Sequence, residues 1–267
     1  MQEYNKVDQH LHLLCQIIGK ANRTFVPEEA DESHTNLYFD SLGNRILGRW
    51  IQTLTGNVLL ALDLNTLNFE VLGSSLNKIL TVSSIGKTME EIEIEFEKLL
   101  PKAGIDPTGF RAPMTHEIPA YSFSKKQLEA IEPQALDQWR YYRKLANQSC
   151  YNFLGYAQAE SEVRIWPEHF DTGVYFEYDG RISMGFGLAM EDSMAGAPYF
   201  YMAGYPKNGP LVFENIPKSP SWRWELGEHW QGAILPVTLL EKVSDSQKEK
   251  ILSDYIIQNF DWYAGMA

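Results

Sequence analysis

The Asp179-Gly180 dipeptide constrains the fold of this chain more than any other local feature. It lies between two stretches of strand-like sequence, residues 174–178 and 181–190. An Asp-Gly pair readily adopts the positive φ angles of a type I′ turn, which joins neighbouring antiparallel strands. The sequence therefore predicts a β-hairpin here.

Turn signals and apolar patterns extend this prediction along the chain. The other expected strands are residues 37–40, 45–51, two strands within 58–72 joined around Asn65, 198–205 and 232–237. The expected helices are residues 4–19, 88–100, 128–158 and 246–263. Together these segments predict an α+β protein of antiparallel sheets with flanking helices.

Residues 88–100 allow two interpretations. The alternation in EIEIEF would suit a strand, whereas the wider apolar spacing suits a helix. Thr88 and Glu91 match a capping box, and Pro101 with Gly104 matches a helix stop, so we favour the helix.

The two ends of the chain share a pattern. Placing residues 37–40 over residues 174–177 also aligns Thr35 with Thr172. We interpret the chain as two pseudo-repeated halves, residues 1–120 and 121–267, packed as one globular unit by duplication. Chance similarity between two hairpins is the alternative. A pseudo-twofold arrangement would bring His34 towards Asp171 and His169.

Composition limits the classes of function. Hydrophobic residues make up 44% of the chain and charged residues 22%, so we expect a folded, soluble protein. A net charge of -12 opposes binding to nucleic acid, whose phosphates require clustered cations. There is neither an apolar run of about 20 residues nor a signal-peptide pattern, so we expect no membrane partner and a cytoplasmic location.

The two cysteines, Cys15 and Cys150, lie far apart in helix-like segments. Two cysteines cannot form a disulfide framework or a four-thiolate zinc site. No base lies near Cys150 in the sequence, so we expect both to be buried free thiols.

Polar residues also follow a helical period near the N-terminus. His12, Gln16 and Lys20 are spaced by four, which places them along one edge of the predicted first helix. We favour a solvated face as the interpretation of this row.

Residues 164–176, RIWPEHFDTGVYF, form the strongest candidate site, because polar and aromatic groups gather in front of a strand. A second polar loop, Ser33 to Asn36, precedes the strand at 37–40. Side chains at the mouth of a strand can hold a ligand or metal, although such residues also make local turn hydrogen bonds. His116 lies in a proline-containing connector.

The combination of LHLLCQ, SHTNL, WPEHFD, PYFY and WQGAILP resembles a family of uncharacterised bacterial proteins. The matching segments span nearly the whole chain. This family often has a second histidine at the position of Glu168. The resemblance supports SHTN and HFD as site candidates and implies no particular reaction.

We therefore consider first an enzyme, a hydrolase of small molecules. Its catalytic residues would be His34, His169 and Asp171, and the same three could bind a divalent metal that activates water. Without metal, His169 could act as a general base oriented by Asp171. Candidate ligand-binding residues are Asn36, His116, Trp166 and Glu168.

Two other interpretations remain open. The loops could form a non-catalytic module for a small polar ligand, with Trp166, Trp222 or Trp224 stacking on it. For Trp222 and Trp224 we favour aromatic packing in the core. Alternatively, the polar motifs could be structural, with buried His and Asp satisfying loop backbone groups.

Overall fold

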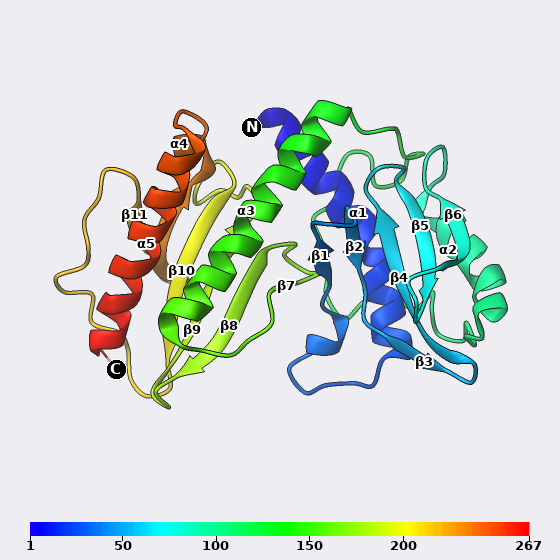
Figure 1. The fold of residues 1–267 in the computed structure, drawn as a ribbon, viewed down its shortest axis with the longest axis horizontal. Helices are drawn as coiled ribbons and strands as arrows, with labels where there is room; N and C mark the ends of the chain where they lie inside the picture. Colours follow the sequence, from blue (N-terminus) through cyan, green and yellow to red (C-terminus); the bar gives the residue numbers. More distant parts are fainter. Residues whose placement is uncertain (267) are drawn as a thin grey trace. The chain divides into compact units, whose positions relative to one another are not determined.

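The computed structural model describes residues 1–266 and confirms the α+β class, with two antiparallel sheets and their flanking helices (Figure 1). The chain forms two compact units. The N-unit comprises residues 6–141 and 165–170, and the C-unit comprises residues 1–5, 142–164 and the chain from residue 171 onward. This grouping differs from the expected halves, 1–120 and 121–267, and their origin by duplication stays a prediction.

The N-unit contains a sheet of short strands in the order β1-β2-β4-β5-β6, with β3 also paired to β4. Its elements are α1 (Gln2–Phe25), the 3-10 helix η1 (Ser33–Thr35), β1 (Tyr38–Asp40), β2 (Arg45–Leu47), β3 (Ile51–Thr53), β4 (Gly56–Asp63), β5 (Asn68–Gly73), β6 (Lys78–Ser83), α2 (Met89–Leu99) and η2 (Leu100–Ala103). Buried Phe69 of β5 packs edge-on against Phe96 of α2, which fixes the helix on the sheet.

The C-unit contains a sheet in the order β11-β12-β10-β9-β8-β7. The long helix α3 (Pro133–Ala157) belongs to the N-unit as far as Tyr141 and to the C-unit beyond it. It is followed by β7 (Arg164–Ile165), β8 (Thr172–Tyr178), β9 (Ile182–Ala189), β10 (Tyr199–Pro206), β11 (Arg223–Leu226), β12 (Gln231–Pro236), α4 (Val237–Leu240) and α5 (Asp245–Met266). Phe153 of α3 contacts Phe186 of β9 and Phe260 of α5, so both helices pack on one face of this sheet (Figure 1).

The Asp179-Gly180 hairpin is confirmed. Asp179 and Gly180 have φ angles of 52° and 67°, and the strands pair from Tyr178 with Ile182 onward. The two strands joined around Asn65 are also confirmed as β4 and β5.

The expected strand at 45–51 is wrong in one respect, because it is broken after Leu47. Gly48 donates its amide to Leu60, and the Arg49 amide turns to the side chain of Asn22 on α1, with a nitrogen to oxygen distance of 2.9 Å. A long-range contact with α1 thus interrupts a locally favourable strand. The exposed edge strand β6 was not predicted.

Both cysteines are buried free thiols, as expected. Burial, with the nearby Asp171 carboxylate, raises the pKa of the Cys150 thiol. Core packing is confirmed for Trp222, which is buried edge-on against Tyr255. Trp224 is only half-buried, where it packs against the half-buried Trp262.

The capping box of α2 generates a first prediction. Thr88 Oγ1 accepts the Glu91 amide at 3.2 Å, and the Glu91 carboxylate accepts the Thr88 amide at 2.7 Å. Thr88→Ala should lower the free energy of unfolding by about 1 kcal/mol, because an orphan helix amide loses its acceptor. Urea denaturation measures this change. Thr88→Ser keeps the hydroxyl and should cost less; equal losses in both variants would contradict the capping role.

Candidate functional site: histidines beside helix α1

Helix α1 has a row of polar residues that is largely inside the protein. Asp8, His12, Gln16 and Lys20 follow one another at intervals of four, and the first three are buried. Lys20 forms an ion pair with Glu93 of α2, with a nitrogen to oxygen distance of 2.6 Å. The expected solvated face is therefore wrong for this row. Loops supply polar partners to His12 and Gln16, and helices α3 and α2 supply Trp139 to Asp8 and Glu93 to Lys20.

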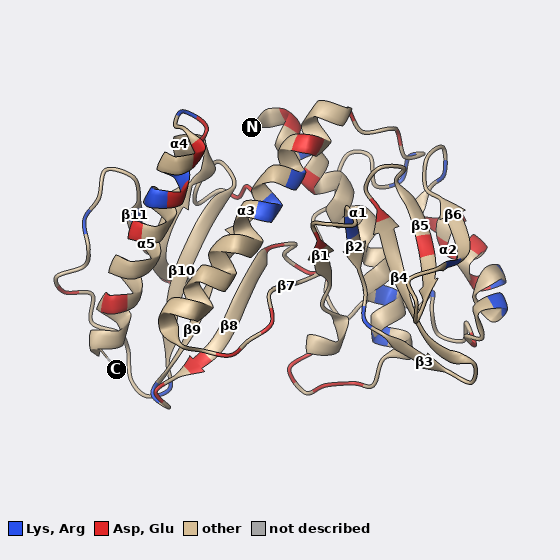
Figure 2. Cartoon of the chain, in the orientation of Figure 1, with Lys and Arg blue, Asp and Glu red and all other residues tan. Residues whose placement is uncertain are grey.

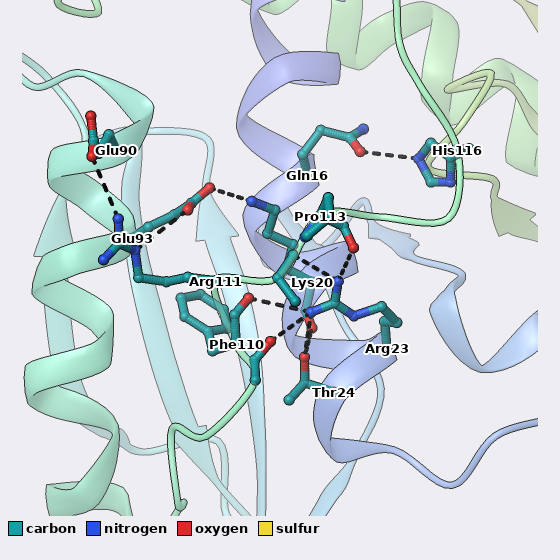
Figure 3. Close-up of polar contacts among 12 residues, drawn as sticks. Gln16, Lys20, Arg23, Thr24, Glu90, Glu93, Phe110, Arg111, Pro113 and His116 are labelled. Carbon is teal, nitrogen blue, oxygen red and sulfur yellow. Dashed lines mark hydrogen bonds and ion pairs between the residues drawn. The ribbon is translucent and has the colours of Figure 1, made fainter.

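One of these loops, residues 109–123, runs along α1 in the opposite direction to the helix. Arg23 donates to its beginning, Gln16 contacts His116 further on, and His12 lies against Tyr121 near its end. Figure 3 shows Arg23, Gln16 and His116 along this path. Side chains of α1 thus hold this loop at three places along its length.

A second loop, residues 166–170, meets the same stretch of α1. The Pro167 carbonyl accepts hydrogen bonds from Gln16 Nε2 at 2.7 Å and from His12 Nε2 at 3.0 Å. Since a carbonyl can only accept, the Nε2 atom of His12 carries a proton. His12 Nδ1 lies 2.7 Å from the Tyr121 hydroxyl, so this imidazole links both loops to the helix.

The second loop closes through a backbone conformation that is unusual for a large residue. Phe170 has a φ of 55°, and its amide donates to the Trp166 carbonyl at 2.7 Å. Its buried ring stacks on His12 at a centroid distance of 5.3 Å. Positive φ at a bulky residue is costly, so surrounding contacts must hold this turn in place.

His116 lies where the two loops meet Gln16. Its Nε2 atom is 3.1 Å from Gln16 Oε1 (Figure 3). An amide oxygen can only accept, so Nε2 carries the proton and Nδ1 of a neutral ring carries the lone pair. Gln16 is itself held, because its amide nitrogen donates to Pro167 and to the His12 carbonyl.

Burial lowers the pKa of the half-buried His116 imidazole from its ordinary value near 6.5. Glu168 and Glu32 act in the opposite direction, and His169 adds to the lowering. These influences place Glu168 and His169 of the second loop within electrostatic range of His116. The result is a neutral imidazole at neutral pH, which can accept a proton.

The structure gives different surroundings to the predicted residues His34 and Asn36. His34 is buried, and its Nδ1 accepts the Glu29 amide at 3.2 Å. The Asn36 carbonyl accepts a hydrogen bond from buried Asn22 of α1 at 3.0 Å. The Asn22 contact holds the SHTN loop against α1, and the His34 contact closes the turn that precedes it.

The candidate loop 166–170 brings Glu168 and His169 towards His116, with Trp166 and Glu168 half-buried and His169 exposed. Asp171 belongs to the C-unit, where its carboxylate accepts the Tyr201 hydroxyl at 2.5 Å. In residues 1–266 no group of three or more His, Cys, Asp or Glu is placed to hold a metal ion. The predicted metal set of His34, His169 and Asp171 is therefore unsupported.

Sequence reasoning did not assign a site role to His12, Gln16 or Tyr121. The four-residue spacing of the row was visible, and its extension to Asp8 could have been noticed. A run of polar residues on an otherwise apolar helix indicates either solvent or buried partners. Only the loop contacts decide between them.

Comparison of the chain with models of protein families, with curated proteins and with solved structures found no match. The resemblance to an uncharacterised bacterial family therefore stays a prediction. Within residues 1–266, no helix combines the length and apolar character needed to cross a membrane.

Close contact between both loops and α1 generates a second prediction. A Cβ atom on Gly19 would lie 3.3 Å from Met114 Cε and 3.4 Å from Pro167 Cβ, whereas one on Gly155 of α3 would meet nothing within 4 Å. Gly19→Val should therefore be about 1–3 kcal/mol less stable than Gly155→Val, because overpacking displaces the loops. Chemical denaturation compares the pair. Equal stabilities would show that the loops do not press on α1.

His116 generates a third prediction, on pH. Its pKa is lowered in the folded protein, so between this value and about 6.5 the unfolded chain binds more protons. Stability should fall as the pH decreases through this window, and His116→Gln should lose that part of the pH dependence. Urea denaturation at pH 7.5 and at lower pH measures it. His229→Gln, a change at an exposed histidine of the C-unit, should behave like the wild type.

Proposed function

We propose that the N-unit acts on a small polar molecule by general-base chemistry at His116. The observation that carries this proposal is the hydrogen bond between His116 Nε2 and Gln16 Oε1, which directs the lone pair to Nδ1. A base must be neutral before it acts, and burial of the ring favours the neutral form. The orienting amide is itself buried and held by two carbonyls.

In an ester hydrolysis, His116 Nδ1 would take a proton from a water molecule as its oxygen bonds to the carbonyl carbon. The ester carbon-oxygen bond then breaks, and the leaving oxygen receives that proton from the imidazolium. Gln16 would stabilise the imidazolium through its amide oxygen, without accepting the proton itself. Glu168 would favour the charged ring in this step, because it lies within electrostatic range.

The charges around His116 favour neutral or cationic molecules with N–H or O–H donors. Glu168 and Glu32 are the carboxylates that act on it. The nearby Lys20 is paired with Glu93, and the Arg23 guanidinium donates to backbone carbonyls. Acidic and basic residues are interspersed along the chain (Figure 2). A phosphate or carboxylate ligand would be repelled by these two carboxylates, and the charge of Lys20 is already paired with Glu93.

A binding module that uses the same acceptors is the alternative. Trp166 is half-buried at the start of the second loop and could pack against an apolar part of the ligand. Binding of such a ligand without turnover would distinguish the two functions. The expected cytoplasmic location stays a prediction from the sequence.

The fourth prediction tests His116 with 4-nitrophenyl acetate, a neutral ester. His116→Gln should lower kcat/KM for its hydrolysis at pH 7 by a factor of about 100 or more, the range of general-base catalysis. The wild-type rate should rise with pH through an apparent pKa below 6.5, in keeping with the lowered pKa of His116.

His229→Gln is the matched control for an exposed imidazole that reacts with the ester without a site. It should keep the wild-type rate and pH profile. Equal rates for His116→Gln and the wild type would exclude His116 as the base. A neutral amine fragment that binds the wild type but not His116→Gln, with no ester hydrolysis in either, would favour the binding module.

A further inference from the structure

Arg23, in the last turn of α1, has a guanidinium group that is bonded almost entirely to the backbone of one loop. Its Nη1 donates to Ala112 at 2.7 Å and also to Pro113, and its Nη2 donates to Gly109 at 2.9 Å and to Phe110 at 3.4 Å. Figure 3 labels Arg23 with two of these partners, Phe110 and Pro113. Four carbonyls within five residues thus converge on one side chain.

This contact fixes the loop backbone itself. The loop residue Phe110 is fully buried and stacks on Phe25 and against Phe96, which anchors the loop on its apolar side. Arg23 holds the polar side, because a planar guanidinium presents several donors in a rigid fork. Neither contact touches His116 directly.

Arg111 holds the same segment from the other side. Its guanidinium approaches three glutamates of α2, at distances of 3.5 Å to Glu90, 3.9 Å to Glu93 and 3.7 Å to Glu97. Glu93 also accepts from Lys20, so α1 and α2 share the loop between them (Figure 3). These ion pairs are partly exposed, so they allow the Arg111 side chain to move. The hydrogen bonds from Arg23 to four carbonyls instead fix the course of the loop backbone.

The position of His116 follows from that path. Only two residues separate Pro113 from His116, and one of them, Met114, lies over Gly19 of α1. A shift of the backbone at Pro113 is therefore carried to the imidazole. A hydrogen bond of 3.1 Å between His116 and Gln16 cannot survive a displacement of about 1 Å with good geometry.

We propose that Arg23 is a positioning residue, which fixes residues 109–113 on α1 and thereby holds His116 Nε2 against Gln16 Oε1. The expected effect of Arg23 on catalysis rests on the proposed role of His116 as a base. The expected effect of Arg23 on the position of the His116 ring does not depend on any reaction.

The test, the fifth prediction, uses Arg23→Lys in the full chain. Lysine keeps the charge, but its ammonium cannot reach four carbonyls in one plane. Histidine-selective NMR titration should show the His116 pKa moving up towards its ordinary value as the ring becomes more hydrated. With 4-nitrophenyl acetate, kcat should fall about tenfold or more, with a smaller change in KM.

Arg140→Lys is the matched control. Arg140 of α3 also donates to a loop of the N-unit, through the Leu64 carbonyl and through Asn65 Oδ1 at 3.2 Å. The Arg140→Lys variant should have a lower free energy of unfolding, with the His116 pKa and kcat unchanged. If both variants move the His116 pKa equally, or neither does, Arg23 has no positioning role.

Arg23→Gln, which can reach at most one or two of the carbonyls, provides a second variant. If neither Arg23 variant folds at 25 °C, Arg23 is a general folding residue and the proposal is overturned. The failure of the proposed function gives a different result: His116→Gln would keep the wild-type hydrolysis rate while Arg23→Lys still moves the His116 titration.

Discussion

The N-unit depends on burying a row of polar side chains along α1. A buried polar group without a hydrogen bond costs folding free energy, so Gln16 and His12 need partners inside the protein. The Pro167 carbonyl supplies a partner to both, and His116 and Tyr121 supply the others. Two loops without regular secondary structure thereby acquire fixed positions. The site follows from this need for satisfied hydrogen bonds.

Elements with strong local signals could be predicted from the sequence. The capping box of Thr88 and the Asp179-Gly180 turn were correct, because each depends on residues within four positions. The break after Leu47 was not foreseen, since it depends on Asn22, more than twenty residues away. The local preference for a strand is overridden where a buried side chain from a distant part of the chain accepts a hydrogen bond from the backbone amide.

The candidate site could be predicted only in part, for the same reason. Glu168, His169 and His116 were recognised as polar loop residues, and the structure places them within electrostatic range of one another. Gln16 orients His116, but its role depends on a partner one hundred residues later in the chain. The sequence shows the helical row and cannot show which loop covers it. His34 had an equally polar sequence context, yet it serves a turn through the Glu29 amide.

The turn at Phe170 shows why this loop is not simply a surface connection. Holding a large residue at positive φ costs on the order of 1–3 kcal/mol, which the contacts around Phe170 must offset. Here the same residue stacks on His12 and on Trp139, so the aromatic contacts offset the backbone cost. The turn leaves Glu168 and His169 between two anchors, Pro167 and Phe170, each held by α1. The anchored turn therefore keeps Glu168 and His169 within electrostatic range of the half-buried His116, which is the arrangement that the proposed general-base site needs.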